Sequence, residues 1–122
     1  MADSARVRFT LPRRLRLQQS RDFARARQRG ERIAQGCLVA NWLKLPQGDS
    51  SQVGVITSRK VGAAVVRSRA RRLLREAFRL SQHDLKGPVA MVLVARPSIA
   101  TKPFDVVVRD YVAALRRGGL LP

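Results

Sequence analysis

Cysteine, histidine, acidic residues and long apolar runs are all scarce in this chain of 122 residues. Cys37 is the only cysteine, which excludes an internal disulfide and a cysteine-based metal site. We expect it to be a small buried residue at the start of a strand. No run approaches the roughly 18 apolar residues of a membrane span, and the N-terminus lacks the apolar stretch of a secretory signal. The sequence therefore predicts a cytoplasmic protein.

The shortage of histidine and carboxylates also argues against catalysis by the chain alone. Hydrolysis without a metal ion usually needs a paired general acid and base, and His83 is the only histidine, with no evident partner. The eight carboxylates show no metal-ligand spacing, and Glu76 is better placed to pair with Arg72 or Arg79 on its own helix. We therefore predict no catalytic residue and no metal ligand in this protein.

Positive charge is what the chain has in excess. It carries 25 Lys and Arg against 8 Asp and Glu, for a formal net charge of +17. Such self-repulsion is costly unless an anionic partner offsets it, and nucleic acid is the first candidate. A membrane surface is less favoured because only 5% of the residues are aromatic. The hydrophobic fraction of 45% is typical of a folded domain, so the chain is not simply a disordered basic tail.

The most informative stretch is the loop–helix segment, residues 58–76, which reads SRKVGAAVVRSRARRLLRE. After a loop marked by Gly62, apolar residues recur at steps of three and four and predict a helix with one buried face. Arginines occupy the remaining faces, and Arg67, Arg71, Arg75 and Arg79 are spaced four apart. Like charges at that spacing weaken an isolated helix, whereas guanidinium groups bind phosphate with paired hydrogen bonds. The segment therefore predicts binding to an RNA backbone.

The rest of the chain is organised as one domain. Residues 1–17 are predicted to be a basic, flexible N-terminal arm, and residues 18–118 a single RNA-binding domain. A first helix is expected between Ser20 and Gly30, and strands over residues 38–45, 53–58 and 89–95. We predict that the first two strands form a hairpin, and that a last helix follows Pro103 and ends at Gly118. This order predicts a two-layer α/β sandwich.

These residues resemble the protein component of bacterial ribonuclease P. The loop–helix segment is similar to that family's signature, whose Arg-Asn-Arg core appears here as Arg67-Ser68-Arg69. Supporting matches run through most of the chain: Arg14-Leu15, Asp22-Phe23, Gly30, Val53-Gly54-Val55 and Val94-Ala95-Arg96. The resemblance implies the order αβββαβα, similar to a ribosomal-protein domain, with a left-handed βαβ crossover. It also implies one strand more than the three predicted from the pattern.

The resemblance implies a function as well. In that family an RNA subunit holds Mg²⁺ and cleaves the precursor of transfer RNA at its 5′ end, so this chain would be a non-catalytic subunit of an endoribonuclease. Its partners would be the catalytic RNA and the precursor, with no membrane or small-molecule substrate. By the resemblance, the residues that contact the catalytic RNA would be Arg59, Lys60, Arg67, Ser68, Arg69, Arg71, Arg72 and Arg75.

A groove between the first helix and the sheet would receive the single-stranded 5′ leader. By the resemblance its residues here would be Phe23, Arg27, Val39, Asn41 and Trp42. Phe23 would stack on a leader base, while strand alternation leaves open whether Trp42 belongs to the groove or to the core. Ser68 and Ala63 stand where the family usually has asparagine, and Arg27 replaces a common aromatic, which favours charge over stacking. The alternative is a ribosomal or ribosome-assembly protein of similar fold with no part in cleavage.

Overall fold

Four strands form a single sheet in the computed structural model, which describes Gln28 and residues 30–122. The strands are β1 (Glu31–Gln35), β2 (Leu38–Lys44), β3 (Gln52–Ile56) and β4 (Val89–Ala95). The three strands predicted from the pattern are confirmed to within two residues, and β1 is the additional strand that the resemblance implied. The predicted arm and most of the predicted first helix lie outside the described residues.

The strand order is β1-β2-β4-β3, so β4 separates β2 from β3. The predicted hairpin between β2 and β3 is therefore wrong. β2 instead forms a hairpin with β1 and is antiparallel to β4, while β3 runs parallel to β4. The central place of β4 agrees with its almost uninterrupted apolar sequence, because a strand with a neighbour on each edge and both faces packed tolerates few polar side chains.

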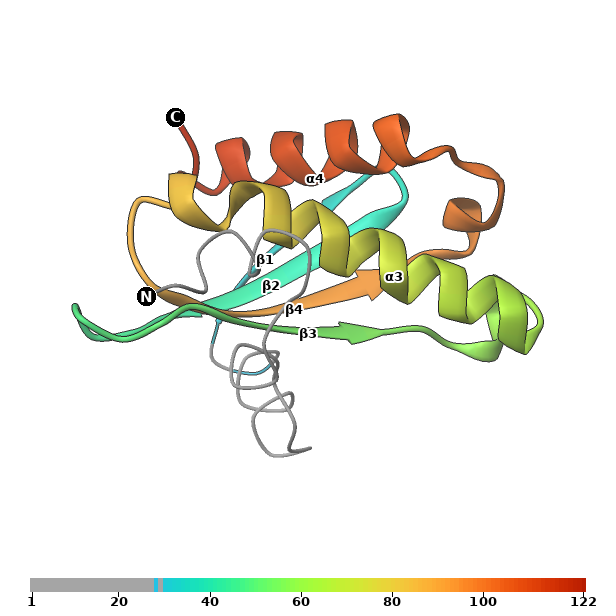
Figure 1. Cartoon of the computed structure of the whole chain (residues 1–122), viewed down its shortest axis with the longest axis horizontal. Coiled ribbons are helices and arrows are strands. Elements are labelled where there is room, and N and C mark those ends of the chain that lie inside the picture. The colour runs from blue at the N-terminus through green and yellow to red at the C-terminus, as the bar shows by residue number, and fades with distance from the viewer. Residues whose placement is uncertain (1–27, 29) are drawn as a thin grey trace, which may run out of the picture.

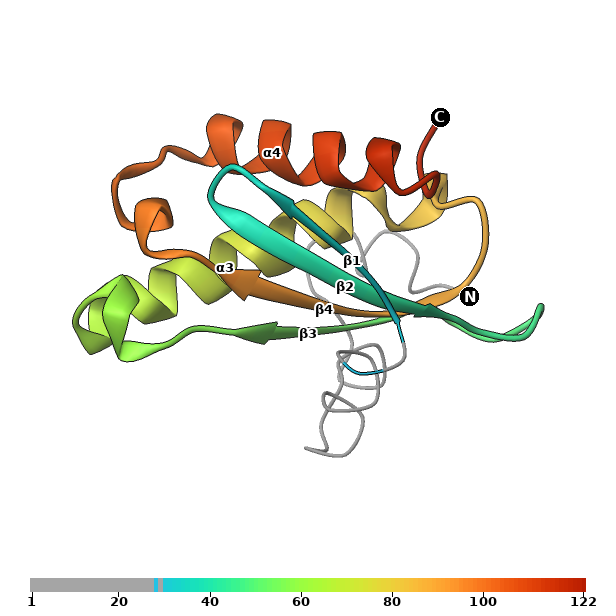
Figure 2. The ribbon, with the colours of Figure 1, turned by 180° about the vertical axis from the view of Figure 1, so that it is seen from behind.

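Two long helices cover one face of this sheet. α3 (Ala64–Ser81) follows a 3₁₀ turn, η2 (Arg59–Val61), and leads through a second turn, η3 (Gln82–Asp84), into β4. A third turn, η4 (Pro97–Thr101), precedes α4 (Phe104–Arg117). Both helices lie in front of the sheet in Figure 1 and behind it in Figure 2. With β3 and β4 pointing up and the helices towards the viewer, β4 lies to the left of β3, so the crossover is left-handed as expected (Figure 1).

The hydrophobic core lies between the helices and the sheet. Alternation along β2 directs Leu38, Ala40 and Trp42 into it, and all three are at most 1% exposed. From the helices, Leu74 and Phe78 of α3 and a matching stripe on α4 close the other side. The core continues past α4 through two buried leucines, Leu120 and Leu121.

A buried carboxylate fixes the turn between β1 and β2. Asp110 of α4 is 7% exposed and its Oδ2 accepts a hydrogen bond of 3.0 Å from the backbone N–H of Cys37. Gly36 precedes Cys37 with a φ of +55°, and a Cβ at that position would lie 2.1 Å from the same carboxylate oxygen. Only glycine therefore allows both this turn and the close approach of Asp110.

Candidate RNA interface

The loop–helix segment lies at the end of the sheet where β3 and β4 both finish. Gly62 joins η2 to α3 with a φ of +147°, and a Cβ there would come within 3.2 Å of the Val66 side chain. Apolar packing then orients the helix, because Ala70, Leu74, Ala77 and Phe78 are buried as the periodicity predicted. The first turn of α3 contains no acidic residue. The positive end of the helix is therefore not offset by a carboxylate of its own first turn.

Two arginines of α3 hold the loop that precedes the helix. Arg67 donates from Nη1 to the carbonyl oxygen of Gly62 at 2.9 Å. Arg71 donates from Nη1 to Oγ1 of Thr57, just after β3, at 2.8 Å, and from Nη2 to Oγ of Ser68 at 3.1 Å. These bonds fix the loop against the helix, and each guanidinium has five N–H donors, so others remain for a ligand.

Arg69 joins α3 to the segment between η4 and α4. Its Nη2 donates to the carbonyl oxygen of Lys102, between η4 and α4, at 2.9 Å. Nothing in the sequence pattern indicated this contact, because the acceptor is a backbone carbonyl 33 residues away. The same is true of the contact between Arg71 and Thr57, because residue 57 falls inside the strand predicted over residues 53–58.

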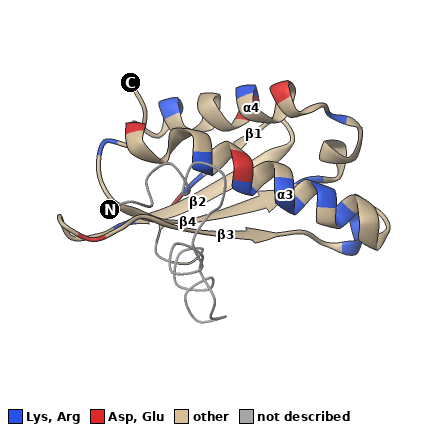
Figure 3. Ribbon diagram, in the orientation of Figure 1, with Lys and Arg blue, Asp and Glu red and all other residues tan. Residues whose placement is uncertain are grey.

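The remaining cations of the segment form its exposed surface. Arg59, Lys60 and Arg72 are exposed, and Arg75 is half-buried. Figure 3 shows basic residues following one another along η2 and the first half of α3. The eight residues predicted to contact the catalytic RNA thus follow one another from η2 along the first two thirds of α3.

Arg79, the last of the four arginines spaced four apart, does not lie on an exposed basic surface as predicted. Its side chain is only 13% exposed and is paired with Glu76, whose Oε1 accepts from Arg79 Nε at 2.8 Å. The hydrogen bond from Arg79 lowers the pKa of Glu76. The expectation of a solvated Arg79 is therefore wrong, because a carboxylate three residues earlier neutralises it against the helix, whereas the predicted pairing with Glu76 is confirmed.

The second predicted site divides between the two faces of the sheet. Val39 and Asn41 point to the face that α3 and α4 do not cover, where Val92 packs with residues of β2, β3 and β4. Both side chains are nevertheless buried, at 7% and 2% exposed. Trp42 points to the opposite face, is 1% exposed and belongs to the core, so its assignment as a leader-binding residue is wrong. Phe23 and Arg27 lie outside the described residues.

The titratable groups elsewhere offer no acid–base pair in the described part of the chain. His83 is exposed in η3. Cys37 is fully buried, and burial together with Asp110 raises the pKa of its thiol to about 11. Burial likewise raises the pKa of the Tyr111 hydroxyl, which shares a hydrogen bond of 2.7 Å with Ser81. Neither helix of residues 30–122 has the length and apolarity needed to cross a membrane.

Comparisons with known proteins agree on one family. Residues 11–119 match the family model described as Ribonuclease P. The chain is 32% identical over 110 residues to the ribonuclease P protein component of Syntrophomonas wolfei, covering 90% of this chain and 92% of that one. Among solved structures, it resembles the Staphylococcus aureus RNase P protein with a TM-score of 0.80 and 20% identity, covering 88% of this chain and 98% of the other. It also resembles the Thermotoga maritima RNase P protein with a TM-score of 0.72 and 26% identity, covering 84% and 96%.

The family match spans most of the chain, and the relative is covered almost completely. The solved structures share the sheet and its two helices. The chain therefore belongs to the family of ribonuclease P protein components, RNA-binding subunits of the ribonucleoprotein endoribonuclease that matures the 5′ ends of transfer RNA.

Proposed function

We propose that the loop–helix segment binds the catalytic RNA of ribonuclease P through its backbone phosphates. The observation that carries this proposal is the cluster of cations at one end of the molecule, in which Arg67, Arg69 and Arg71 are fixed by hydrogen bonds to the surrounding chain. Side chains held in this way lose less conformational freedom when a ligand binds. Arg59, Lys60, Arg72 and Arg75 would add contacts, and Ser68 would act by orienting Arg71.

We further propose that the sheet face bearing Val39 and Asn41 receives the 5′ leader of precursor transfer RNA. The support is that this face combines apolar positions with an amide side chain and is not covered by either long helix. Val39 and Asn41 are 7% and 2% exposed, so binding through them would require neighbouring parts of the chain to give way. Phe23 and Arg27, from the matched Asp22-Phe23 stretch, would complete the leader site by stacking and charge. A site of this composition would accept many leader sequences, because stacking and backbone charge do not distinguish bases.

The chemistry of cleavage is assigned in this proposal to the RNA and its Mg²⁺ ions. Among the described residues, no three His, Cys, Asp or Glu side chains lie close enough together to hold a metal ion. The protein would instead position the precursor and raise the local density of positive charge, and so reduce the Mg²⁺ that cleavage needs. A cytoplasmic location, where transfer RNA precursors are made, is part of the same proposal.

Cleavage of a 5′-extended precursor by the cognate catalytic RNA at low Mg²⁺ tests the overall role. Addition of the protein should stimulate cleavage strongly, and the protein without the RNA should not cleave. Tight RNA binding without any stimulation would instead favour a ribosome-associated binder of similar fold.

A paired charge deletion tests the assignment of the RNA-binding surface. The double variant R59Q/R72Q removes two exposed cations of the loop–helix segment. R109Q/R116Q removes two exposed cations from α4 as a control of equal charge, and Arg109 Nε is 3.9 Å from Asp110 Oδ1, so its folding is checked by thermal unfolding. Binding of the catalytic RNA should lose about 0.7–0.9 in the slope of log K against log salt for each phosphate contact removed. Equal slopes for the two variants would contradict the assignment.

A further inference from the structure

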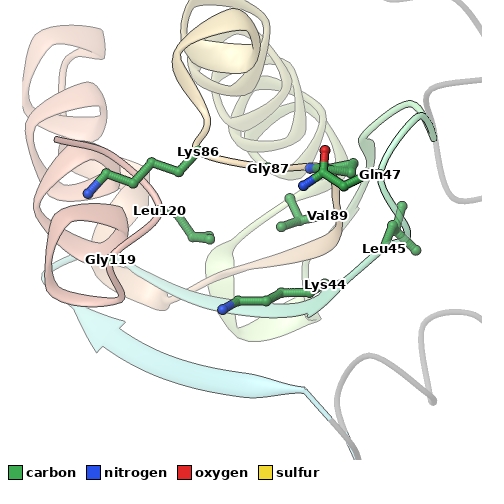
Figure 4. Close-up of a pocket in the computed structure, with 9 residues that line it drawn as sticks. Lys44, Leu45, Gln47, Lys86, Gly87, Val89, Gly119 and Leu120 are labelled. Atoms are coloured by element: carbon green, nitrogen blue, oxygen red, sulfur yellow. The ribbon is translucent and has the colours of Figure 1, made fainter.

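A small hollow lies at the end of the sheet opposite to the loop–helix segment. It has a volume of about 200 Å³ and opens where β2 ends and β4 begins, beside the turn that follows α4. Lys44 and Lys86 line it from segments 42 residues apart, with Gln47 at its far side near Gly87 (Figure 4). The two lysine side chains extend on either side of Leu120 (Figure 4). Two lysines and a glutamine from separate parts of the chain therefore line the hollow, with both lysine side chains extending away from Gln47 (Figure 4).

The backbone around the hollow is fixed by hydrogen bonds between its segments. The N–H of Lys86 donates to the carbonyl oxygen of Leu120 at 3.0 Å, and the N–H of Leu45 donates to that of Pro88 at 2.9 Å. Val89, which pairs with Lys44 in the sheet, donates its N–H to Oγ of Ser51 at 3.0 Å. The two lysines thus project from a frame that does not need to be ordered by a ligand.

The charge of the hollow is not neutralised within the described part of the chain. Neither Lys44 nor Lys86 forms an ion pair with a described residue, and no carboxylate lines the hollow. The acidic residues closest in sequence, Asp49 and Asp84, are exposed and lie outside its lining. An anion entering here would therefore meet two cations and no competing acid.

The size of the hollow restricts what that anion can be. Pockets that enclose a small molecule or cofactor usually measure about 300–1,000 Å³, so this one is too small to bury such a ligand. A phosphate group of an extended chain needs only partial enclosure, and the apolar walls formed by Val89 and Leu120 suit an adjoining sugar. We propose that this hollow is a second RNA-binding site, in which Lys44 and Lys86 bind the phosphate backbone.

The position of the hollow separates it from the surface already described. Arg59 and Lys60 precede α3 and Lys86 follows it, so the 18 residues of α3, about 27 Å at 1.5 Å per residue, lie between the start of the loop–helix segment and the hollow. The hollow and the start of the loop–helix segment would therefore bind different parts of an RNA. Lys44 points to the same side of the sheet as Trp42, the side that the helices cover, whereas the proposed leader path is on the other face. This favours a phosphate of the catalytic RNA, an assignment that rests on the proposed function.

The test compares three double variants that each remove two positive charges. K44Q/K86Q removes the two positive charges that line the hollow, and R59Q/R72Q removes two from the loop–helix segment. R109Q/R116Q removes two from α4 and is the control. K44R/K86R keeps the charge of the hollow and serves as the conservative variant. Affinities for the catalytic RNA, for a 5′-extended precursor transfer RNA and for the mature transfer RNA are measured over a range of salt concentrations. Thermal unfolding of each variant establishes that it is folded.

We expect K44Q/K86Q to lose about 0.7–0.9 of the salt slope for the catalytic RNA, the value for one phosphate contact, and K44R/K86R to retain it. If K44Q/K86Q loses this slope with the precursor transfer RNA and not with the catalytic RNA, the phosphate belongs to the substrate. Slopes equal to those of R109Q/R116Q for all three RNAs would overturn the second site. If the second site is overturned but R59Q/R72Q still loses salt slope, the proposed function of the loop–helix segment stands. If R59Q/R72Q loses no salt slope either, the proposed function is contradicted as well.

Discussion

The contact between Trp42 and Gly118 allows a direct test of which face of the sheet the tryptophan occupies. Gly118 ends α4 with a φ of −83°, a conformation open to any residue. A Cβ at this position would lie 2.3 Å from Cη2 and 2.5 Å from Cζ2 of Trp42. Real Cβ atoms essentially never come within 3.0 Å of another atom, so the ring or the helix end would have to move by about 0.7 Å. The Trp42 ring is buried and has no free space into which to move.

Two opposing effects decide the sign of the substitution G118A. Replacing glycine by alanine at a compatible backbone position stabilises a protein by about 0.4–1 kcal/mol through the unfolded state. Overpacking a core costs about 1–3 kcal/mol, so the net effect should be destabilising by about 1–2 kcal/mol. For a domain of this size, 1 kcal/mol corresponds to about 4 °C in Tm. Urea and thermal unfolding both measure the change.

The double variant with W42F isolates the cause. Phenylalanine lacks the outer edge of the indole ring, so G118A should become neutral or slightly stabilising in the W42F background, giving a coupling within the usual range of about 0.5–3 kcal/mol. G119A provides the control, because Gly119 has a φ of +77° and a Cβ added there would meet no atom within 4 Å, so its cost should be the same in both backgrounds. An equal cost of G118A in both backgrounds would refute the reasoning. W42F should also leave discrimination between precursor and mature transfer RNA unchanged.

Three further outcomes follow from buried and paired groups. D110A should lower the free energy of unfolding by about 1–3 kcal/mol in urea titrations, because the buried N–H of Cys37 loses its acceptor; an unchanged midpoint would contradict that role. Cys37 should react with a thiol reagent at pH 8 only after denaturation, because its pKa is raised to about 11 and the thiolate is the reactive form; native-state labelling at the rate of free cysteine would show the thiol to be accessible. E76Q should destabilise the protein by about 0.5 kcal/mol at neutral pH, because the salt bridge with Arg79 is lost. Since that pair lowers the folded-state pKa of Glu76, its contribution is present above the ordinary pKa and disappears as the pH falls through the lowered one, so wild type and E76Q should converge in acid unfolding curves.

Local patterns in the sequence were sufficient to predict most of the described elements. The spacing of apolar residues predicted α3 with its buried face, and α4 and β4 were predicted close to their observed bounds. The order of the strands in the sheet could not be predicted from these local patterns, because strand pairing depends on contacts between distant segments. β2 and β3 are neighbours in sequence, and only the crossover through α3 inserts β4 between them. The short β1 was missed because most of its side chains are exposed and its sequence lacks the alternation of a half-buried strand.

The division of site residues between faces shows a second limit of the sequence. Alternation along β2 requires Asn41 and Trp42 to point to opposite faces, but it does not say which face carries the helices. The decisive contact for Trp42 is with Gly118, a residue 76 positions later whose lack of a side chain gives the ring its space. Val39 and Asn41 then belong to the other face by the same alternation. A leader site at this sheet is thus restricted to every second residue of the strand.

The arginines of α3 show why spacing alone did not reveal their roles. The pattern placed Arg67, Arg71 and Arg79 in one row, as if all three were equivalent on a wet surface. In the structure Arg79 is neutralised by Glu76, whereas Arg67 and Arg71 hold the loop before the helix. Their acceptors are a backbone carbonyl and a hydroxyl, which leave the positive charge uncompensated. In the proposed interface an RNA phosphate would neutralise that charge without releasing the loop, because the spare donors of each guanidinium can bind it while the existing hydrogen bonds remain.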